Sequence, residues 1–254
     1  MAWWIAEEST GLTRTQIITG CKGTTNFSNL QDIIARLLHF EPIQYVFGHT
    51  LWGGLDLKLT PATLIPRPET AELVEHIIGM SDFRDNGISR RVLDIGTGSG
   101  CIAIALKKRH PNWQITGIDI SSEAIDVAKE NARRNEVEVT FEQADIFSDE
   151  NGAIGTFDIV VSNPPYICER EKATMRRNVL DYEPASALFV PDNDPLLFYR
   201  RIAQLHIGKY LFLEINEAHA DELSAMLDSF GYTDTHIIYD SYGKPRIIES
   251  RMVG

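Results

Sequence analysis

The chain has 254 residues, of which 43% are hydrophobic and 24% are charged, and its formal net charge at pH 7 is −12. This is the composition of an ordinary globular protein, and it excludes a disordered, collagen-like or fibrous chain. The excess of acidic residues argues against a general nucleic-acid binder, because phosphate contacts require clustered cations.

The first part of the chain is predicted to be a small helical unit followed by a β-hairpin. Residues 1–48 read as helical, with apolar residues at helix spacing. Residues 51–60 alternate in two short pieces around a Gly-Gly pair, which indicates a hairpin. A connector rich in proline follows. We therefore expect a helical N-terminal domain over 1–48 and a hairpin and linker over 49–69.

From residue 70 onward, helices and strands alternate, so we expect one domain over 70–254. Apolar or alternating runs predict strands at 92–95, 114–119, 137–144, 157–162 and 210–215. Helical periodicity is found at 70–80, 102–108, 122–135 and 222–230, and a polar loop is expected at 81–89. Such alternation is typical of an α/β fold, a doubly wound and mostly parallel sheet with helices on both faces.

Two further strands close the chain, at 236–239 and 245–250. The turn that joins them is short, whereas a parallel crossover needs a dozen or more residues. These two strands are therefore predicted to pair antiparallel.

Nothing in the sequence indicates export, a membrane anchor or a metal site. Apolar runs are too short to cross a bilayer, and residues 1–8 lack the features of a signal peptide. Cys21, Cys101 and Cys168 are widely spaced and odd in number, which argues against a disulfide framework and a structural zinc site. We expect a cytoplasmic protein without a metal ion.

A glycine-rich turn lies between the first strand of the sheet and the helix that follows. It reads Asp94-Ile95-Gly96-Thr97-Gly98-Ser99-Gly100. Glycines let the backbone turn sharply and let a ligand approach the main chain. The spacing differs from that of dinucleotide binders, and no P-loop lysine follows. This pattern predicts a ligand site at the carboxyl edge of the sheet and makes a nicotinamide oxidoreductase a distant alternative.

Acidic residues are predicted to end three successive strands. Asp94 leads the glycine turn, Asp119 closes the second strand, and Asp145 follows the third. The position of Asp119 suits hydrogen bonds from ribose hydroxyls, and that of Asp145 suits an adenine amine. This constellation resembles the Rossmann-like methyltransferases and points to S-adenosylmethionine. The residues expected to bind it are Asp94, Gly96, Thr97, Gly98, Gly100, Asp119, Ile120, Asp145, Ile146 and Asn163.

A stiff loop follows the fourth strand directly and reads Asn163-Pro164-Pro165-Tyr166. Its two prolines fix φ and remove two N–H donors. The Asn163 side-chain oxygen and the Pro164 carbonyl could hold the two hydrogens of a planar NH₂ group. We expect Asn163, Pro164 and Tyr166 to be catalytic, with Tyr166 packing on the flat substrate group. Orientation and electrostatic preorganisation would supply most of the rate enhancement.

This loop resembles that of the amino methyltransferases, which modify DNA bases, ribosomal-RNA guanine or protein glutamine. Three more segments, 41–48, 51–53 and 61–70, closely resemble the PrmC/HemK family. That family methylates the glutamine N5 of the Gly-Gly-Gln motif in class-1 peptide chain release factors. The resemblance runs from about residue 30 to 251.

The resemblance implies transfer from S-adenosylmethionine, with S-adenosylhomocysteine as product, and a release factor as partner. The residues expected to bind the substrate are Arg67, Asn163, Pro164, Pro165, Tyr166 and Glu183. For Arg67, which follows the hairpin, a structural salt link is an equal alternative. The chain departs from the family pattern at Ala71, where Glu is usual, and at Asn216, where Gly or His is usual. Its helical N-terminal part is also expected to be shorter than the family's substrate-binding bundle, which would affect affinity for the release factor.

Two other functions fit parts of the pattern. A DNA or ribosomal-RNA amino methyltransferase would share the loop, but it would need a basic groove, and the net charge of −12 argues against it. A non-catalytic scaffold that binds S-adenosylmethionine would not need Asn163 and Tyr166. The leading expectation is a protein glutamine methyltransferase that binds no membrane and forms no stable complex with nucleic acid.

Overall fold

A seven-stranded mixed sheet forms the centre of the C-terminal part in the computed structural model, which describes residues 1–23, 29–83, 87–148 and 155–252. Its strands are β3 (Arg91–Ile95), β4 (Gln114–Asp119), β5 (Thr140–Gln143), β6 (Phe157–Ser162), β9 (Gly208–Glu214), β10 (Tyr232–Tyr239) and β11 (Pro245–Met252). They lie in the order β10-β11-β9-β6-β3-β4-β5. β11 is antiparallel to both neighbours, and the pairs from β9 through β6, β3 and β4 to β5 are parallel. The predicted sheet with an antiparallel last strand is confirmed.

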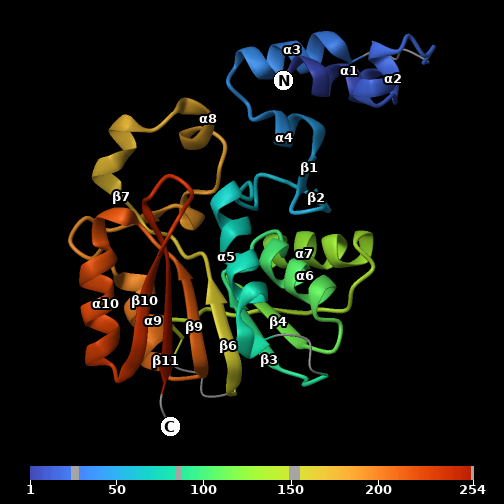
Figure 1. Ribbon diagram of the computed structural model, residues 1–254. Helices are drawn as coiled ribbons and strands as arrows, with labels where there is room; N and C mark the ends of the chain where they lie inside the picture. The colour runs from blue at the N-terminus through green and yellow to red at the C-terminus, as the bar shows by residue number, and fades with distance from the viewer. Residues whose placement is uncertain (24–28, 84–86, 149–154, 253–254) are drawn as a thin grey trace.

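Helices cover both faces of this sheet, as predicted. One face carries α5 (Pro68–Gly79), α6 (Cys101–Arg109) and α7 (Ser122–Arg134). The other carries α9 (Leu197–Leu205) and α10 (Ala220–Ser229). Successive residues of β3 point to opposite layers, so Val92 joins the first core and Leu93 the second. Figure 1 shows the resulting three layers.

Local signals in the sequence fix where two of these helices begin. Pro68 occupies the first turn of α5, where its missing N–H costs no hydrogen bond. Ser121 caps α7, because its side chain accepts a hydrogen bond from the Ala124 N–H. Both helices thereby start beside the carboxyl edge of the sheet.

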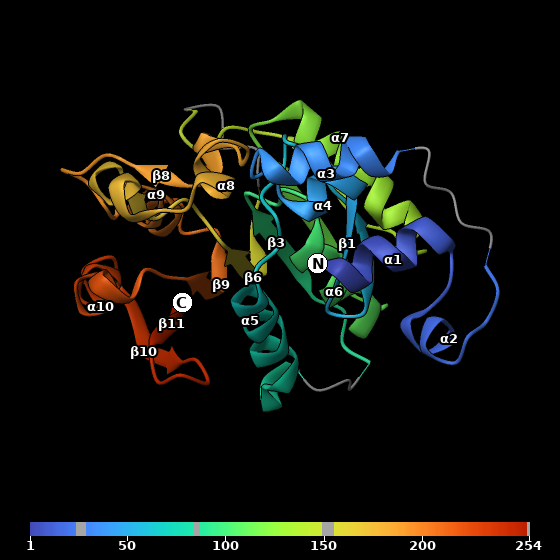
Figure 2. The same cartoon turned by 90° about the horizontal axis from the view of Figure 1, so that it is seen from above.

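The N-terminal part contains four short helices and a hairpin. The helices are α1 (Ala2–Thr10), α2 (Arg14–Ile18), α3 (Leu30–Leu38) and α4 (Ile43–Phe47). The hairpin strands are β1 (His49–Trp52) and β2 (Leu55–Lys58), which pair antiparallel as predicted. In Figures 1 and 2, α1 to α4 lie above the carboxyl edge of the sheet, on the side of α6 and α7, and the hairpin lies between them and the sheet.

Asn131 of α7 ties the hairpin to the rest of the fold. Its side-chain oxygen accepts a hydrogen bond from the Lys58 N–H at 2.6 Å, and its nitrogen donates to the Lys58 carbonyl at 3.0 Å. The same nitrogen donates to the Ser99 carbonyl in the glycine turn at 2.8 Å. The hairpin and the glycine turn are therefore held by one fully buried amide.

The segment between β6 and β9 holds elements that the sequence patterns did not predict. They are β7 (Ile167–Cys168), η3 (Glu169–Thr174), α8 (Arg177–Leu180), η4 (Ala185–Ala187), β8 (Phe189–Val190) and α9. β7 and β8 pair in parallel as a separate two-stranded sheet. The predicted loop at 81–89 begins with a 3-10 helix, η1 (Ser81–Phe83), and its residues 84–86 lie outside the described part.

Within the described ranges, no helix is long and apolar enough to cross a membrane. In the same ranges, no three His, Cys, Asp or Glu side chains are grouped so that they could hold a metal ion.

Candidate functional site

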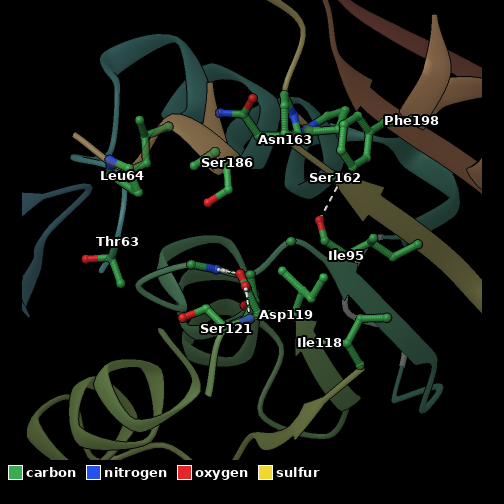
Figure 3. A pocket seen from close by; sticks show the side chains of 18 of the residues that line it. Thr63, Leu64, Ile95, Ile118, Asp119, Ser121, Ser162, Asn163, Ser186 and Phe198 are labelled. Atoms are coloured by element: carbon green, nitrogen blue, oxygen red, sulfur yellow. Dashed lines mark hydrogen bonds between the residues drawn. The ribbon is translucent and has the colours of Figure 1, made fainter. Parts of the chain in front are cut away.

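A cavity of about 380 Å³ opens at the carboxyl ends of the parallel strands. Its walls come from the residues that follow β3, β4, β5 and β6, from the connector 61–68, and from the segment 184–189. Figure 3 shows Asp119 and Ser121 on one side of it and Asn163 on the other. This is the edge at which open α/β sheets bind ligands.

The glycine turn forms one wall of the cavity. Gly96, Gly98 and Gly100 have φ values of 70°, 53° and 80°, which side chains rarely tolerate. Gly96, Thr97 and Gly98 line the cavity, whereas Gly100 does not. A Cβ at Gly100 would lie 3.1 Å from Ala128, so Gly100 permits close packing of α6 against α7. A ligand contact at Gly100 stays a prediction.

Asp94 lies beneath the turn and does not line the cavity. Its side chain is completely buried, and its Oδ2 accepts hydrogen bonds from the Thr97 hydroxyl at 2.6 Å and the Ala103 N–H at 3.3 Å. Burial raises the pKa of this carboxyl to about 7. In the structure Asp94 shapes the glycine turn, and its contact with the cofactor stays a prediction.

The residues at the ends of β4 and β5 line the cavity. The Asp119 carboxylate accepts hydrogen bonds from the Gly98 N–H at 2.9 Å and the Ser121 N–H at 3.0 Å. These bonds hold the carboxylate beside the glycine turn. Asp145 also lines the cavity, and its carboxylate accepts from the Phe147 N–H at 2.9 Å. Ile120 and Ile146 add apolar walls.

Asn163, Pro164 and Pro165 line the opposite side. The Asn163 side-chain nitrogen donates a hydrogen bond to the Thr70 hydroxyl oxygen at 3.1 Å. With the nitrogen engaged in this way, the side-chain oxygen of Asn163 is left as an acceptor. The loop therefore has the acceptor that its residue types predict.

Tyr166 does not line the cavity. Its hydroxyl donates to Glu214 Oε1 at 3.0 Å, and its ring packs against the apolar core on the α9 side of the sheet. Burial raises the pKa of this phenol well above its usual value. The ring has a partner within the fold, so the structure does not place it against a substrate.

Arg67 and Glu183 also lie outside the cavity walls. The Glu183 side chain is fully buried and lies 2.7 Å from the Arg67 guanidinium. Its second oxygen accepts a hydrogen bond from the Ile65 N–H at 3.2 Å. This pair is the structural salt link that was the alternative for Arg67, and it fixes the connector, in which Thr63 and Leu64 line the cavity. Substrate contacts of Arg67 and Glu183 stay predictions.

The cavity also contains residues that sequence reasoning missed. The principal ones are Thr63, Thr70, Ser121, Phe147, Ser186 and Phe198. Thr70 follows the helix-start signal of Pro68 and Ser121 is itself the N-cap of α7, and helix starts beside a carboxyl edge are natural ligand sites. Ser186 and Phe198 belong to the segment between β6 and β9, whose elements were not predicted.

Comparison with known proteins agrees with the family resemblance found in the sequence. The family described as "Methyltransferase small domain" matches residues 75–181. A protein of Bacteroides thetaiotaomicron named "Release factor glutamine methyltransferase" is 47% identical over 91% of this chain and 82% of its own length. A protein of Flavobacterium psychrophilum with the same name is 43% identical over 86% of this chain and 78% of its own length.

Among solved structures, the N-terminal domain of human METTL16 in complex with SAH shares the fold. Its TM-score is 0.55 at 18% identity, over 91% of this chain and 85% of that chain. This likeness supports the methyltransferase type of sheet that the sequence pattern indicates.

Proposed function

The chain belongs to the release factor glutamine methyltransferases, and from that premise we propose how its cavity binds and orients the reactants. It is an enzyme that transfers a methyl group from S-adenosylmethionine to a glutamine side-chain amide of a release factor. We propose that the glutamine is that of the Gly-Gly-Gln motif of class-1 factors and that the methyl group goes to its N5.

We propose that the wall formed by β3, β4 and β5 holds the cofactor. The Asp119 carboxylate would accept hydrogen bonds from the ribose hydroxyls, and Asp145 would meet the adenine amine. The positive-φ glycines leave the main chain open to close approach, and Ile120, Ile146 and Phe147 offer apolar surface to the base. When bound, S-adenosylmethionine supplies a methyl group that is already activated as a sulfonium.

We propose that Asn163 and Pro164 orient the substrate amide. An amide nitrogen is a poor nucleophile, because its lone pair is delocalised into the carbonyl group. Two acceptors that hold its hydrogens would fix its direction and stabilise the charge that develops on it. The observation that carries this proposal is the hydrogen bond from the Asn163 nitrogen to Thr70, because it leaves the Asn163 oxygen as an acceptor at the cavity.

We propose that the N-terminal helical domain, residues 1–48, contacts the release factor at a distance from the chemistry. Its helices lie above the carboxyl edge where the cavity opens. They expose large apolar side chains, of which Ile18 is 65% exposed and Leu38 is 73% exposed. Recognition there would leave the cavity to select a short strand with a single glutamine, and flanking glycines would admit it without side-chain clashes. We further propose a cytoplasmic location, where termination of translation takes place.

The test is mass spectrometry of a purified class-1 release factor after incubation with the enzyme and S-adenosylmethionine. We expect a single added methyl group on the Gly-Gly-Gln glutamine. A Gln→Asn change in that motif should abolish it, because the shorter side chain withdraws the nitrogen from the acceptors. Duplex DNA and naked ribosomal RNA serve as competing substrates and should stay unmethylated. Methyl transfer to a base, with none on the release factor, would contradict the proposal.

A further inference from the structure

Four side chains form a continuous hydrogen-bonded chain behind the Asn163 wall of the cavity. The Asn163 nitrogen donates to Thr70 Oγ1 at 3.1 Å, and the Thr70 hydroxyl donates to Glu214 Oε2 at 2.6 Å. The Tyr166 hydroxyl donates to the other oxygen, Glu214 Oε1, at 3.0 Å. The second and third members of this hydrogen-bonded chain, Thr70 and Glu214, are separated by 144 positions in sequence.

The direction of each proton in this chain is determined by the Glu214 carboxyl group, to which both hydroxyls donate. An ionised carboxylate has no proton to donate and can only accept. While Glu214 is ionised, the single hydroxyl proton of Thr70 must therefore go to Glu214, so Thr70 Oγ1 can only accept from Asn163. Only the nitrogen of the Asn163 amide can meet that requirement. The amide is thereby held with its oxygen available to the cavity.

We infer that Thr70 and Glu214 are positioning residues for methyl transfer, which set the orientation of the Asn163 amide so that its oxygen, and not its nitrogen, meets the substrate. This inference rests on the proposed role of Asn163 as an acceptor. Neither residue needs to contact the reacting atoms, because Glu214 acts through Thr70 and Thr70 acts through Asn163.

The surroundings of Glu214 make this orientation sensitive to protonation. Glu214 is 1% exposed, and burial raises its pKa. Hydrogen bonds from Thr70 and Tyr166 and the positive charge of Arg246 lower that pKa, while the negative charge of Glu69 raises it. Arg246 is itself paired with Asp240.

Protonation of Glu214 removes the requirement on Thr70. A protonated carboxyl can donate to Thr70 Oγ1, and the Thr70 hydroxyl can then donate to the Asn163 oxygen. The amide is free to turn, and its nitrogen would face the substrate. Turnover should therefore be lost as the pH falls through the raised pKa of Glu214.

The first test separates orientation from packing at position 70. Thr70→Val keeps the shape but removes the hydroxyl, and we expect kcat to fall by about tenfold, less than direct loss of a preorganised group. The affinity for S-adenosylmethionine, measured by calorimetry, should stay within about threefold, less than the tenfold of a lost charge-assisted bond. Thr70→Ser restores the hydroxyl and should restore kcat. Thr235→Val, the same change at a partly exposed hydroxyl on β10, is the matched control and should leave kcat unchanged.

The second test follows the pH dependence of kcat. In the unmodified enzyme, kcat should fall on the acid side as Glu214 takes up a proton. Glu214→Gln removes the titrating group, so this fall should disappear. Tyr166→Phe removes a hydrogen bond that lowers the pKa of Glu214, so the fall should move to higher pH.

Three outcomes would overturn the inference. They are a Thr70→Val enzyme with normal kcat, a Thr70→Ser enzyme as impaired as Thr70→Val, and an acid-side fall that persists unchanged in Glu214→Gln. Other results would contradict the proposed function itself. They are an Asn163→Ala enzyme that stays active, or a release factor whose glutamine carries no methyl group. An inactive Asn163→Ala enzyme beside a fully active Thr70→Val enzyme would overturn the positioning role alone.

Discussion

The guanidinium of Arg67 lies 2.7 Å from the buried carboxylate of Glu183, although 116 positions separate the two residues in the chain. This pair joins the connector after the hairpin to the segment after the Asn163 loop. Both segments supply cavity walls, through Thr63 and Leu64 on one side and Pro184 on the other. The ion pair therefore holds two walls of the cavity together.

Glu183→Ala should destabilise the protein by about 2–3 kcal/mol. The change leaves the Ile65 N–H without its acceptor and Arg67 without its partner. Removing one member of a buried ion pair typically costs about 3–5 kcal/mol, and the partial exposure of Arg67 reduces this figure. Urea unfolding would measure it. Asp181→Ala, which breaks an exposed pair with Arg177, is the control and should cost under about 1 kcal/mol. Equal effects of the two changes would contradict the structural role of Glu183.

Asp119→Ala should weaken the binding of S-adenosylmethionine about tenfold or more, because each charge-assisted hydrogen bond contributes about 1.5–3 kcal/mol. The carboxylate also accepts from the N–H groups of Gly98 and Ser121, so part of the loss would come from a looser glycine turn. Calorimetry on the folded variant gives the affinity. Asp126→Ala removes one negative charge from an exposed position of α7 and should bind the cofactor normally. An unchanged affinity in Asp119→Ala would refute the assignment to the ribose.

Asn163→Ala should lower kcat by about 10²-fold or more, by analogy with the loss of one preorganised polar group. The affinity for the cofactor should change little, since the walls from β4 and β5 are untouched. Single-turnover kinetics with a release factor, together with calorimetry, separate the two effects. If cofactor affinity collapses along with the rate, Asn163 is a binding residue and not the group that orients the amide.

The central sheet could be predicted well from the sequence, because buried parallel strands are continuous apolar runs. The predicted strands at 114–119 and 157–162 have the same bounds as β4 and β6. α9 was not predicted, although its buried residues Tyr199, Ile202 and Ala203 follow helical spacing, because the helix is short and no side chain caps its start. β7 and β8 have two residues each, and strands of this length are too short to show a periodic sequence pattern.

The residues of the candidate site also differ in how well the sequence predicts them. Residues at strand ends, such as Asp119 and Asn163, could be placed from topology alone, because the carboxyl ends of parallel strands meet at one edge. Whether a side chain at such an end faces the cavity or the core depends on partners that are distant in sequence. Tyr166 forms a hydrogen bond with Glu214, which lies 48 positions later. No local sequence pattern predicts such a pairing.

The buried carboxyl of Asp94 should make stability fall as the pH rises through the weakly acidic range. Its pKa is raised from 3.8 to about 7 in the folded protein, with burial as the main cause. Between these two values the folded state binds more protons than the unfolded state, so the free energy of unfolding decreases with increasing pH. Above about 7 the contribution of this group is lost and the dependence flattens.

Asp94→Asn cannot titrate, and its amide keeps an acceptor for Thr97 and Ala103. Urea unfolding at several pH values from 4.5 to 7.5 (roughly the window between the two pKa values) should therefore show the stability of Asp94→Asn gaining steadily on that of the unmodified protein. Asp126→Asn, the same change at an exposed site on α7, is the matched control. A constant difference between Asp94→Asn and the unmodified protein across this range would mean that Asp94 is ionised throughout, and that the turn is built on a buried charge.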